Sequence, residues 1–224
     1  MYINPEKKLI FIHIPKNAGT SVVERLLEDE NWKHLWVYHP EAKDKYFQKT
    51  GHVCASILKE YPIYDDFETV ALARNPWSKQ LSTYMFWLSQ MRKIMDGSLY
   101  KEFSKKGETE KENFLNPWVE KEHPPLVTNG FRGYLEKEYT NRGTALNIGP
   151  SVNWVDENRK AKHHWFKIET EMGLAADFFG IELLERLNTT QHLDYTKYYD
   201  ESMIEIVRER NEKDIKKFNY KFGQ

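Results

Sequence analysis

Cysteine is the scarcest residue of this chain, since Cys54 is the single thiol in 224 residues. One cysteine excludes an internal disulfide framework and any metal site built from several cysteines. We therefore expect a protein of a reducing compartment, with a cytoplasmic location. Neither sign of charge predominates, because 33 Lys and Arg nearly balance 34 Asp and Glu and leave a formal net charge of −1. This balance argues against a positive electrostatic field over the whole surface, which would bind nucleic acid. A local basic pocket is still compatible with the balanced charge.

Long hydrophobic runs are missing as well, and none approaches the roughly 20 residues that span a bilayer. The first apolar stretch begins at Leu9 and ends at Pro15, which makes it too short for a signal peptide. Hydrophobic residues nevertheless make up 40% of the chain, so a sizeable core can form. The chain also contains no internal repeat. We expect a single domain over residues 1–224 without a membrane span.

A strand–loop–helix pattern occurs twice. Residues 8–14 and 67–73 are short apolar runs rich in β-branched side chains, which is typical of buried strands. The first run is followed by a helical stripe over residues 20–27. The second is followed by Asn75, a good N-cap, and Pro76, a good first helical residue. Repetition of this unit predicts an α/β fold whose central parallel sheet is flanked by helices.

The remaining segments fit the same fold class. A third strand is predicted over residues 164–168, followed by a helix over residues 171–179. A final helix over residues 202–218 is expected to close the domain. Residues 96–150 differ, because they are highly charged in part and show no apolar period. We interpret them as an insertion on the side of the acceptor substrate.

The segment between the first strand and its helix has the composition of an anion-binding loop. It reads PKNAGTS over residues 15–21 and leads directly into a predicted helix N-terminus, where N–H groups and partial positive charge attract anions. Gly19 permits close approach of the backbone, and Lys16 adds a mobile positive charge. An ordinary capped helix start is the alternative interpretation, since Thr and Ser cap many helices.

Arg74 supplies a second candidate contact for an anion. It follows the second predicted strand, at the sheet edge where open α/β folds place ligands. Ser82 lies about two helical turns further on, so that both side chains are expected to reach one anion. A surface ion pair of Arg74 is the alternative.

The loop is not a Walker A motif. That motif requires lysine directly after its second glycine, whereas Lys16 precedes Gly19 by three positions. Ile14 also stands where the first glycine belongs. These departures argue against a magnesium-dependent ATPase or kinase.

Together the two segments resemble the sulfotransferases that use 3′-phosphoadenosine-5′-phosphosulfate (PAPS). The likeness is to their carbohydrate branch, which includes heparan-sulfate 2-O-, chondroitin and dermatan sulfotransferases. Residues 15–21 resemble the family's 5′-phosphosulfate loop. Residues 74–84 resemble its 3′-phosphate motif, with Lys79 where arginine is commoner. Residues 165–169, 187–195 and 214–222 resemble later family segments in the same order.

The resemblance implies a P-loop-kinase-like sulfotransferase fold and a set of site residues. PAPS would be the co-substrate and adenosine 3′,5′-bisphosphate (PAP) the product, without a metal. Arg74 and Ser82 would hold the 3′-phosphate, and residues 188–195 would close over the nucleotide. Lys16 would also neutralise charge on the leaving phosphate oxygen. The 5′-phosphosulfate would be held by Lys16, Asn17, Ala18, Gly19, Thr20 and Ser21.

His52 is the catalytic base that the resemblance implies, because members of this branch carry a Gly-His segment between the two nucleotide motifs. A histidine near its ordinary pKa of roughly 6.5 can accept a hydroxyl proton at neutral pH. His13 is a competitor for this role, although strand alternation is expected to bury it. The acceptor would be a hydroxyl, with a saccharide as the favoured class. Two alternatives remain: a nucleotide kinase that uses ATP and Mg²⁺, and a non-catalytic module that binds a nucleotide or sulfated glycan.

Overall fold

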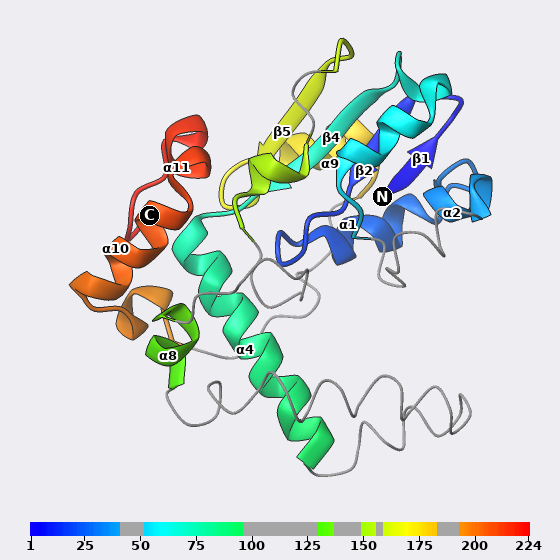
Figure 1. Cartoon of the computed structure of the whole chain (residues 1–224). Helices are drawn as coiled ribbons and strands as arrows, with labels where there is room; N and C mark the ends of the chain where they lie inside the picture. Colours follow the sequence, from blue (N-terminus) through cyan, green and yellow to red (C-terminus); the bar gives the residue numbers. More distant parts are fainter. Residues whose placement is uncertain (41–51, 96–129, 137–148, 156–158, 183–192) are drawn as a thin grey trace. The chain divides into compact units, whose positions relative to one another are not determined.

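The computed structural model describes residues 1–40, 52–95, 130–136, 149–155, 159–182 and 193–224 (Figure 1). These residues form a mixed α/β structure around a five-stranded sheet of order β3-β1-β2-β4-β5. The strands are β1 (Tyr2–Asn4), β2 (Leu9–Ile12), β3 (Lys33–His34), β4 (Glu68–Ala73) and β5 (His163–Lys167). The α/β class predicted from the repeated strand–loop–helix unit is therefore confirmed.

The prediction of a wholly parallel sheet is wrong at one side. Strands β2, β4 and β5 are parallel neighbours, whereas β1 pairs antiparallel with both β2 and β3. The reason lies in the connection between β1 and β2, which spans only residues 5–8. A connection this short allows a hairpin but not the crossover that parallel pairing requires. The parallel part of the sheet is thus the part that the strand–loop–helix units build.

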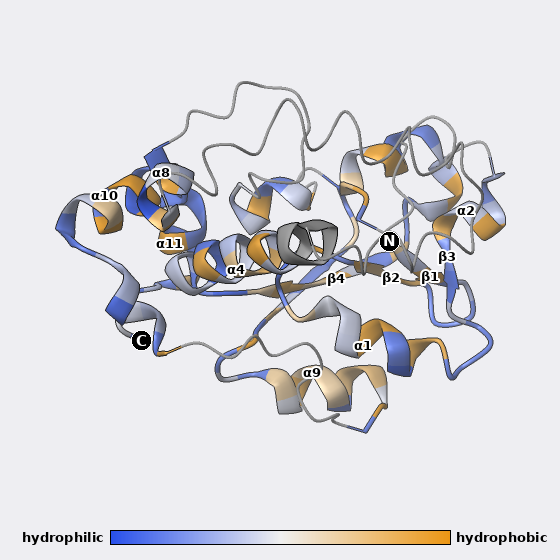
Figure 2. Cartoon of the chain, turned by 90° about the horizontal axis from the view of Figure 1, so that it is seen from below, coloured by the Kyte–Doolittle hydropathy of each residue, from blue (hydrophilic) through white to orange (hydrophobic). Residues whose placement is uncertain are grey.

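Helices cover the sheet on both faces. Figure 2 shows α1 (Gly19–Leu26) and α9 (Met172–Phe179) on one side and α2 (Leu35–Tyr38) on the other. Strand β2 is buried along its whole length, so its side chains alternate between two cores. Ile10 and Ile12 contribute to one core, and Leu9 and Phe11 to the other. The 3₁₀ helices η1 (Ala55–Glu60) and η2 (Pro62–Tyr64) add apolar side chains to the Ile10 core.

Two compact units make up the chain. The first comprises Met1–Lys79, Gly149–Thr189 and Arg210–Gln224 and contains the sheet. The second comprises Gln80–Ile148 and Thr190–Glu209. Helix α4 (Pro76–Met95) begins in the first unit and continues in the second. Within the described part of the chain, no helix combines the length and the hydropathy needed to cross a bilayer.

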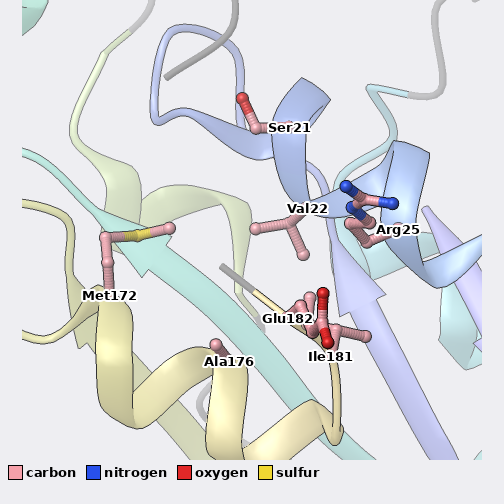
Figure 3. Close-up of a pocket in the computed structure, with 7 residues that line it drawn as sticks. All are labelled: Ser21, Val22, Arg25, Met172, Ala176, Ile181 and Glu182. Atoms are coloured by element: carbon pink, nitrogen blue, oxygen red, sulfur yellow. The ribbon is translucent and has the colours of Figure 1, made fainter. Parts of the chain in front are cut away.

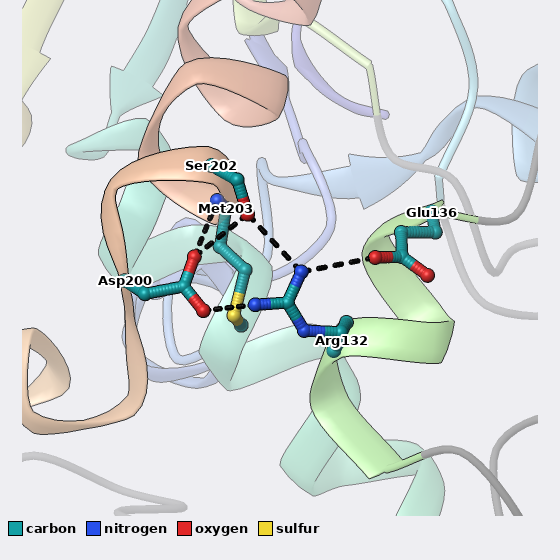
Figure 4. Close-up of polar contacts among 5 residues, drawn as sticks. All are labelled: Arg132, Glu136, Asp200, Ser202 and Met203. Carbon is teal, nitrogen blue, oxygen red and sulfur yellow. Dashed lines mark hydrogen bonds and ion pairs between the residues drawn. The ribbon is translucent and has the colours of Figure 1, made fainter.

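The second unit contains α8 (Gly130–Glu136), the 3₁₀ helix η5 (Tyr195–Tyr198) and most of α10 (Glu201–Arg210). The Arg132 guanidinium donates to Glu136, Ser202 and Asp200, and thereby joins α8 to the start of α10 (Figure 4). All these side chains are exposed, so solvent screens these ion pairs and they contribute little to stability. Of the insertion expected over residues 96–150, only α8 and residues 149–150 are described.

The predicted C-terminal helix is broken. Residues 202–218 lie in two helices, α10 and α11 (Glu212–Phe218), which are separated by Asn211. Asn211 is 1% exposed, and its backbone carbonyl accepts from the Ile215 N–H at the start of α11. Asparagine has a weak preference for helix interiors and favours their ends, which explains the break.

Candidate functional site

The candidate site lies at the carboxyl edge of the parallel strands. Strands β2 and β4 are paired in register, with Ile12 opposite Ala71, so the loops that follow them meet at the same edge. The contact is direct, because Arg74 Nη1 donates to the Lys16 carbonyl over 2.9 Å. The structure therefore brings the first predicted segment and the start of the second together.

The loop between β2 and α1 has an unusual backbone. Lys16 and Ala18 both have positive φ angles, of 63° and 59°, which side-chain-bearing residues seldom adopt. The Asn17 side chain holds the loop in place, because its amide donates to the Leu72 carbonyl over 2.6 Å and to Ser151 Oγ over 3.0 Å. Such local strain persists only where the surroundings fix it, and it occurs often at ligand sites.

The N-terminus of α1 is left open to a ligand by its sequence. Its N-cap residue is Ala18, which has no side chain able to accept from the first N–H groups, and the first turn holds no acidic residue. The partial positive charge of the helix end is therefore not offset locally. Ala18 and Thr20 are exposed and Ser21 is half-buried, so this end of the helix faces the surface.

Gly19 is required by a close approach. A Cβ atom at this position would lie 2.2 Å from Cδ2 of His13, well inside contact distance. His13 is 6% exposed, as strand alternation predicted, and its ring stacks on that of Phe11. Burial and the neighbouring His52 lower the pKa of His13 to about 2. This histidine is therefore neutral and enclosed beneath the loop, which makes it a poor candidate for a base that contacts substrate.

His52 is fixed by the backbone of the same strand end. Its Nδ1 lies 2.9 Å from the His13 carbonyl oxygen, and the centroids of the two imidazole rings are 4.2 Å apart. A carbonyl oxygen can only accept, so Nδ1 carries the proton and Nε2 is the basic nitrogen. Burial lowers the pKa of His52 to about 4; the hydrogen bond to the His13 carbonyl acts in the opposite direction, and nearby positive charges that include Lys16 lower the pKa further. The expectation of an ordinary pKa near 6.5 does not hold, because the ring is largely removed from water.

Lys16 and Arg74 form the positive part of the site. Burial and the adjacent Arg74 lower the pKa of the Lys16 ammonium to about 8, so it remains mostly charged at neutral pH. The Arg74 guanidinium also donates to Ser78 Oγ, from Nε over 3.2 Å and from Nη2 over 2.9 Å. Arg74 thus supports the loop through the Lys16 carbonyl and lies half-buried beside it.

The other predicted site residues fall into three groups. Asn17 is 1% exposed and its side chain points inward, so it supports the loop. Ser82 is buried on α4 in the second unit, and its position relative to Arg74 stays a prediction. Of residues 188–195, which were expected to close over the nucleotide, 188–192 lie outside the described residues.

Sequence reasoning missed two supporting residues, Ser151 and Asp214, which are both fully buried. Ser151 Oγ accepts from Asn17, while the Asp214 carboxylate accepts from the N–H groups of Ser151 and Val152. A serine directly after the expected insertion and an aspartate in a charged helix carry no signal that marks them as buried. The predicted N-cap of α4 is confirmed, since Asn75 Oδ1 accepts from the Trp77 N–H over 3.1 Å.

A small cavity lies between α1 and α9 (Figure 3). Its volume of about 30 Å³ holds one or two water molecules and is far too small for a nucleotide. We interpret it as a packing gap between the two helices. It is lined by Ser21, Val22, Arg25, Met172, Ala176, Ile181 and Glu182.

Metal-ligating groups do not cluster in the described ranges, where no three His, Cys, Asp or Glu side chains are placed to hold an ion.

Comparison with known proteins found no family model, no curated protein and no solved structure that matches the chain. A functional assignment therefore rests on the residues of the site.

Proposed function

We propose that this chain is a PAPS-dependent sulfotransferase with a P-loop-like nucleotide site, which transfers a sulfuryl group to a hydroxyl, with a saccharide as the favoured acceptor class. One observation carries the proposal: three segments separated in sequence meet at one sheet edge. Arg74 bonds to the Lys16 carbonyl, and His52 bonds to the His13 carbonyl directly before the loop. An anion cradle, a cation and an oriented base are the groups that sulfuryl transfer needs.

The loop fits the 5′ end of such a donor. Helix α1 offers an N-terminus without an acidic residue or a side-chain cap, and Lys16 places positive charge beside it. Thr20 and Ser21 would add hydroxyl donors, and Gly19 keeps the backbone close to the strand. Arg74 would add guanidinium N–H groups for the 3′-phosphate, and a contribution from Ser82 stays a prediction. The donor, when bound, supplies an activated sulfuryl group.

The side chains of this protein would carry out the proton transfer and stabilise the charge of the leaving group. Nε2 of His52 takes the proton of the acceptor hydroxyl as its oxygen forms the new bond to sulfur. The bond from sulfur to the phosphate oxygen breaks at the same time, and the Lys16 ammonium stabilises the negative charge left on that oxygen. The products are a sulfate ester and PAP, with the proton held on His52. Cytoplasmic location stays a prediction from the single cysteine.

Nucleotide preference tests the proposal against its two rivals. A ligand present at 100 times its Kd and bound only by the folded state stabilises by about 2.7 kcal/mol, and each kcal/mol shifts Tm by roughly 2–4 °C at this size. We expect PAP without Mg²⁺ to raise Tm by roughly 5–10 °C and ADP to do far less. Arg74→Ala should lose most of this shift. Arg208→Ala, which removes an exposed arginine of α10, should retain it.

Equal shifts with PAP and ADP would contradict a 3′-phosphate site, and a shift that appears only with ATP and Mg²⁺ would favour the kinase. Transfer is then measured with ³⁵S-labelled PAPS and a panel of unsulfated mono- and oligosaccharides. Labelled sulfate esters are the expected product. PAP binding without transfer to any acceptor in the panel would favour the binding module.

A further inference from the structure

Lys79 is an unexpected residue of the site, because a lysine in the predicted 3′-phosphate motif is completely buried. It lies in the first turn of α4, and its exposed fraction is 0%. Its ammonium donates to the Gly149 carbonyl over 2.9 Å and to Ser151 Oγ over 3.0 Å. A cation enclosed in this way cannot contact a phosphate group that arrives from solvent.

The partners of Lys79 connect it to the anion loop. Ser151 Oγ, which accepts from Lys79, also accepts from the Asn17 amide over 3.0 Å. The same Asn17 amide reaches the Leu72 carbonyl of β4 over 2.6 Å. The buried Ser151 hydroxyl therefore connects the Lys79 ammonium of α4 to the side chain of Asn17. Asn17 lies between the two loop residues with positive φ angles.

The opposite side of Ser151 is fixed by α11. Asp214, which is 0% exposed, accepts from the Ser151 N–H over 2.6 Å and from the Val152 N–H over 3.0 Å. The short helix η4 (Ser151–Trp154) is thereby held between a buried carboxylate and a buried ammonium. Burial lowers the pKa of Lys79 to about 8 and Asp214 acts in the opposite direction, so the ammonium stays mostly charged at neutral pH.

Removing a lysine from water is costly unless it is well hydrogen-bonded, so a buried lysine indicates a role that an apolar side chain does not fill. We infer that Lys79 is a positioning residue, which acts through Ser151 and Asn17 to hold the anion loop in its strained conformation, and that it is not a ligand of the nucleotide. The inference rests on the proposed function in one respect, since it takes the loop to be the nucleotide-binding element.

Hydrogen–deuterium exchange of the full-length chain tests the inference without an activity assay. Ser151→Ala removes the bridging hydroxyl and leaves the backbone bond to Asp214, while Lys79→Met removes the ammonium. In both variants we expect amides of residues 16–21 to exchange about 3–10-fold faster, because each lost hydrogen bond contributes roughly 0.5–1.5 kcal/mol. Amides of β4 should exchange as in the wild type. PAP should bind about 3–10-fold more weakly to both variants.

Lys213→Met is the matched control, because exposed Lys213 donates to Asn153 of the same helix η4 over 3.2 Å. It should leave both loop exchange and PAP affinity unchanged. Unaltered loop exchange in Ser151→Ala and Lys79→Met would overturn the inference, as would faster exchange spread evenly over β4 and the loop. If Lys79→Met does not fold, Ser151→Ala decides alone. If the wild type does not bind PAP, the proposed function is wrong. The exchange rates of the loop amides still test the hydrogen-bond network of Lys79, Ser151 and Asn17 in that case.

Discussion

At the scale of single residues, burial sets the charges that the proposed reaction needs. His52 and Lys16 are ordinary titratable side chains, and the same cause, loss of water, lowers both pKa values. For the histidine the result is a neutral base with Nε2 as its basic nitrogen. For the lysine the result is a cation that persists only up to about pH 8. The two groups are therefore in the required forms over one interval of pH.

That interval predicts the dependence of kcat/KM on pH. Protonation of His52 near pH 4 removes the base, and deprotonation of Lys16 near pH 8 removes the cation, so we expect a broad maximum between about pH 5 and 7. Lys16→Arg keeps a positive charge at high pH and should shift the alkaline limb upward. His52→Ala should lower turnover by about 10²–10⁴-fold and remove the acid limb. Initial rates of labelled sulfate transfer provide the measurement.

PAP binding serves as the control for both variants, since neither change removes the loop backbone or Arg74. Near-normal turnover in His52→Ala would exclude this histidine as the base. An acid limb near pH 6.5 in the wild type would show that the ring is more hydrated than its burial indicates.

At the scale of elements, the segments predicted correctly are those whose signal is local. Apolar periodicity predicts the strands around Ile10 and Val70, and the capping residues predict the helix after Asn75. These elements place the anion loop and Arg74 at the same edge of the sheet. Strand β3 has only two residues, too few for a period to show. The burial of Lys79 was also unpredictable, because it depends on partners 70 and 72 residues away in the sequence.

The close approach of Gly19, in α1, to His13, directly after β2, provides a sharp test of the loop geometry. A methyl group at this position would overlap the His13 ring, so Gly19→Ala should destabilise the protein by about 1–3 kcal/mol, as overpacking does. Replacing the ring in Gly19→Ala/His13→Ala should recover stability relative to the sum of the single changes. Gly173→Ala, at a helical position with no atom near the new methyl group, is the control and should not destabilise. Urea unfolding measures the four variants, and additive effects in the double variant would contradict the contact.

At the scale of the sheet-containing unit, three histidines gather near the ends of β2 and β3: His13 and His34 are buried, and His52 is half-buried. His13 and His52 have adjacent rings, and the charge interactions of His34 extend to His52. Burial first, followed by neighbouring positive charges, lowers the pKa of His34 to about 3, beside values of about 2 for His13 and about 4 for His52. All three are neutral in the folded protein over most of the acid range, whereas in the unfolded chain they bind protons below about pH 6.5.

This difference fixes the sign of the dependence of stability on pH. Between about pH 6.5 and 4 the unfolded chain binds more protons than the folded protein, so the free energy of unfolding falls as the pH is lowered. Each histidine contributes a loss that approaches about 1.4 kcal/mol per pH unit where the unfolded histidine is fully protonated and the folded one is still neutral. We therefore expect Tm to fall by several degrees between pH 7 and pH 5.5, and to change little between pH 7 and pH 8 on account of these groups.

His34→Asn isolates one share of this loss. His34 Nδ1 accepts from the Trp36 N–H at the start of α2, and an asparagine oxygen can accept the same bond without titrating. The variant should lose about a third of the decrease in Tm between pH 7 and pH 5.5, measured by calorimetry in matched buffers. His164→Asn is the control, because His164 lies on β5, where its Nε2 contacts the Glu68 carboxylate, outside the cluster formed by His13, His34 and His52. An unchanged slope in His34→Asn would show that the acid sensitivity arises elsewhere in the chain.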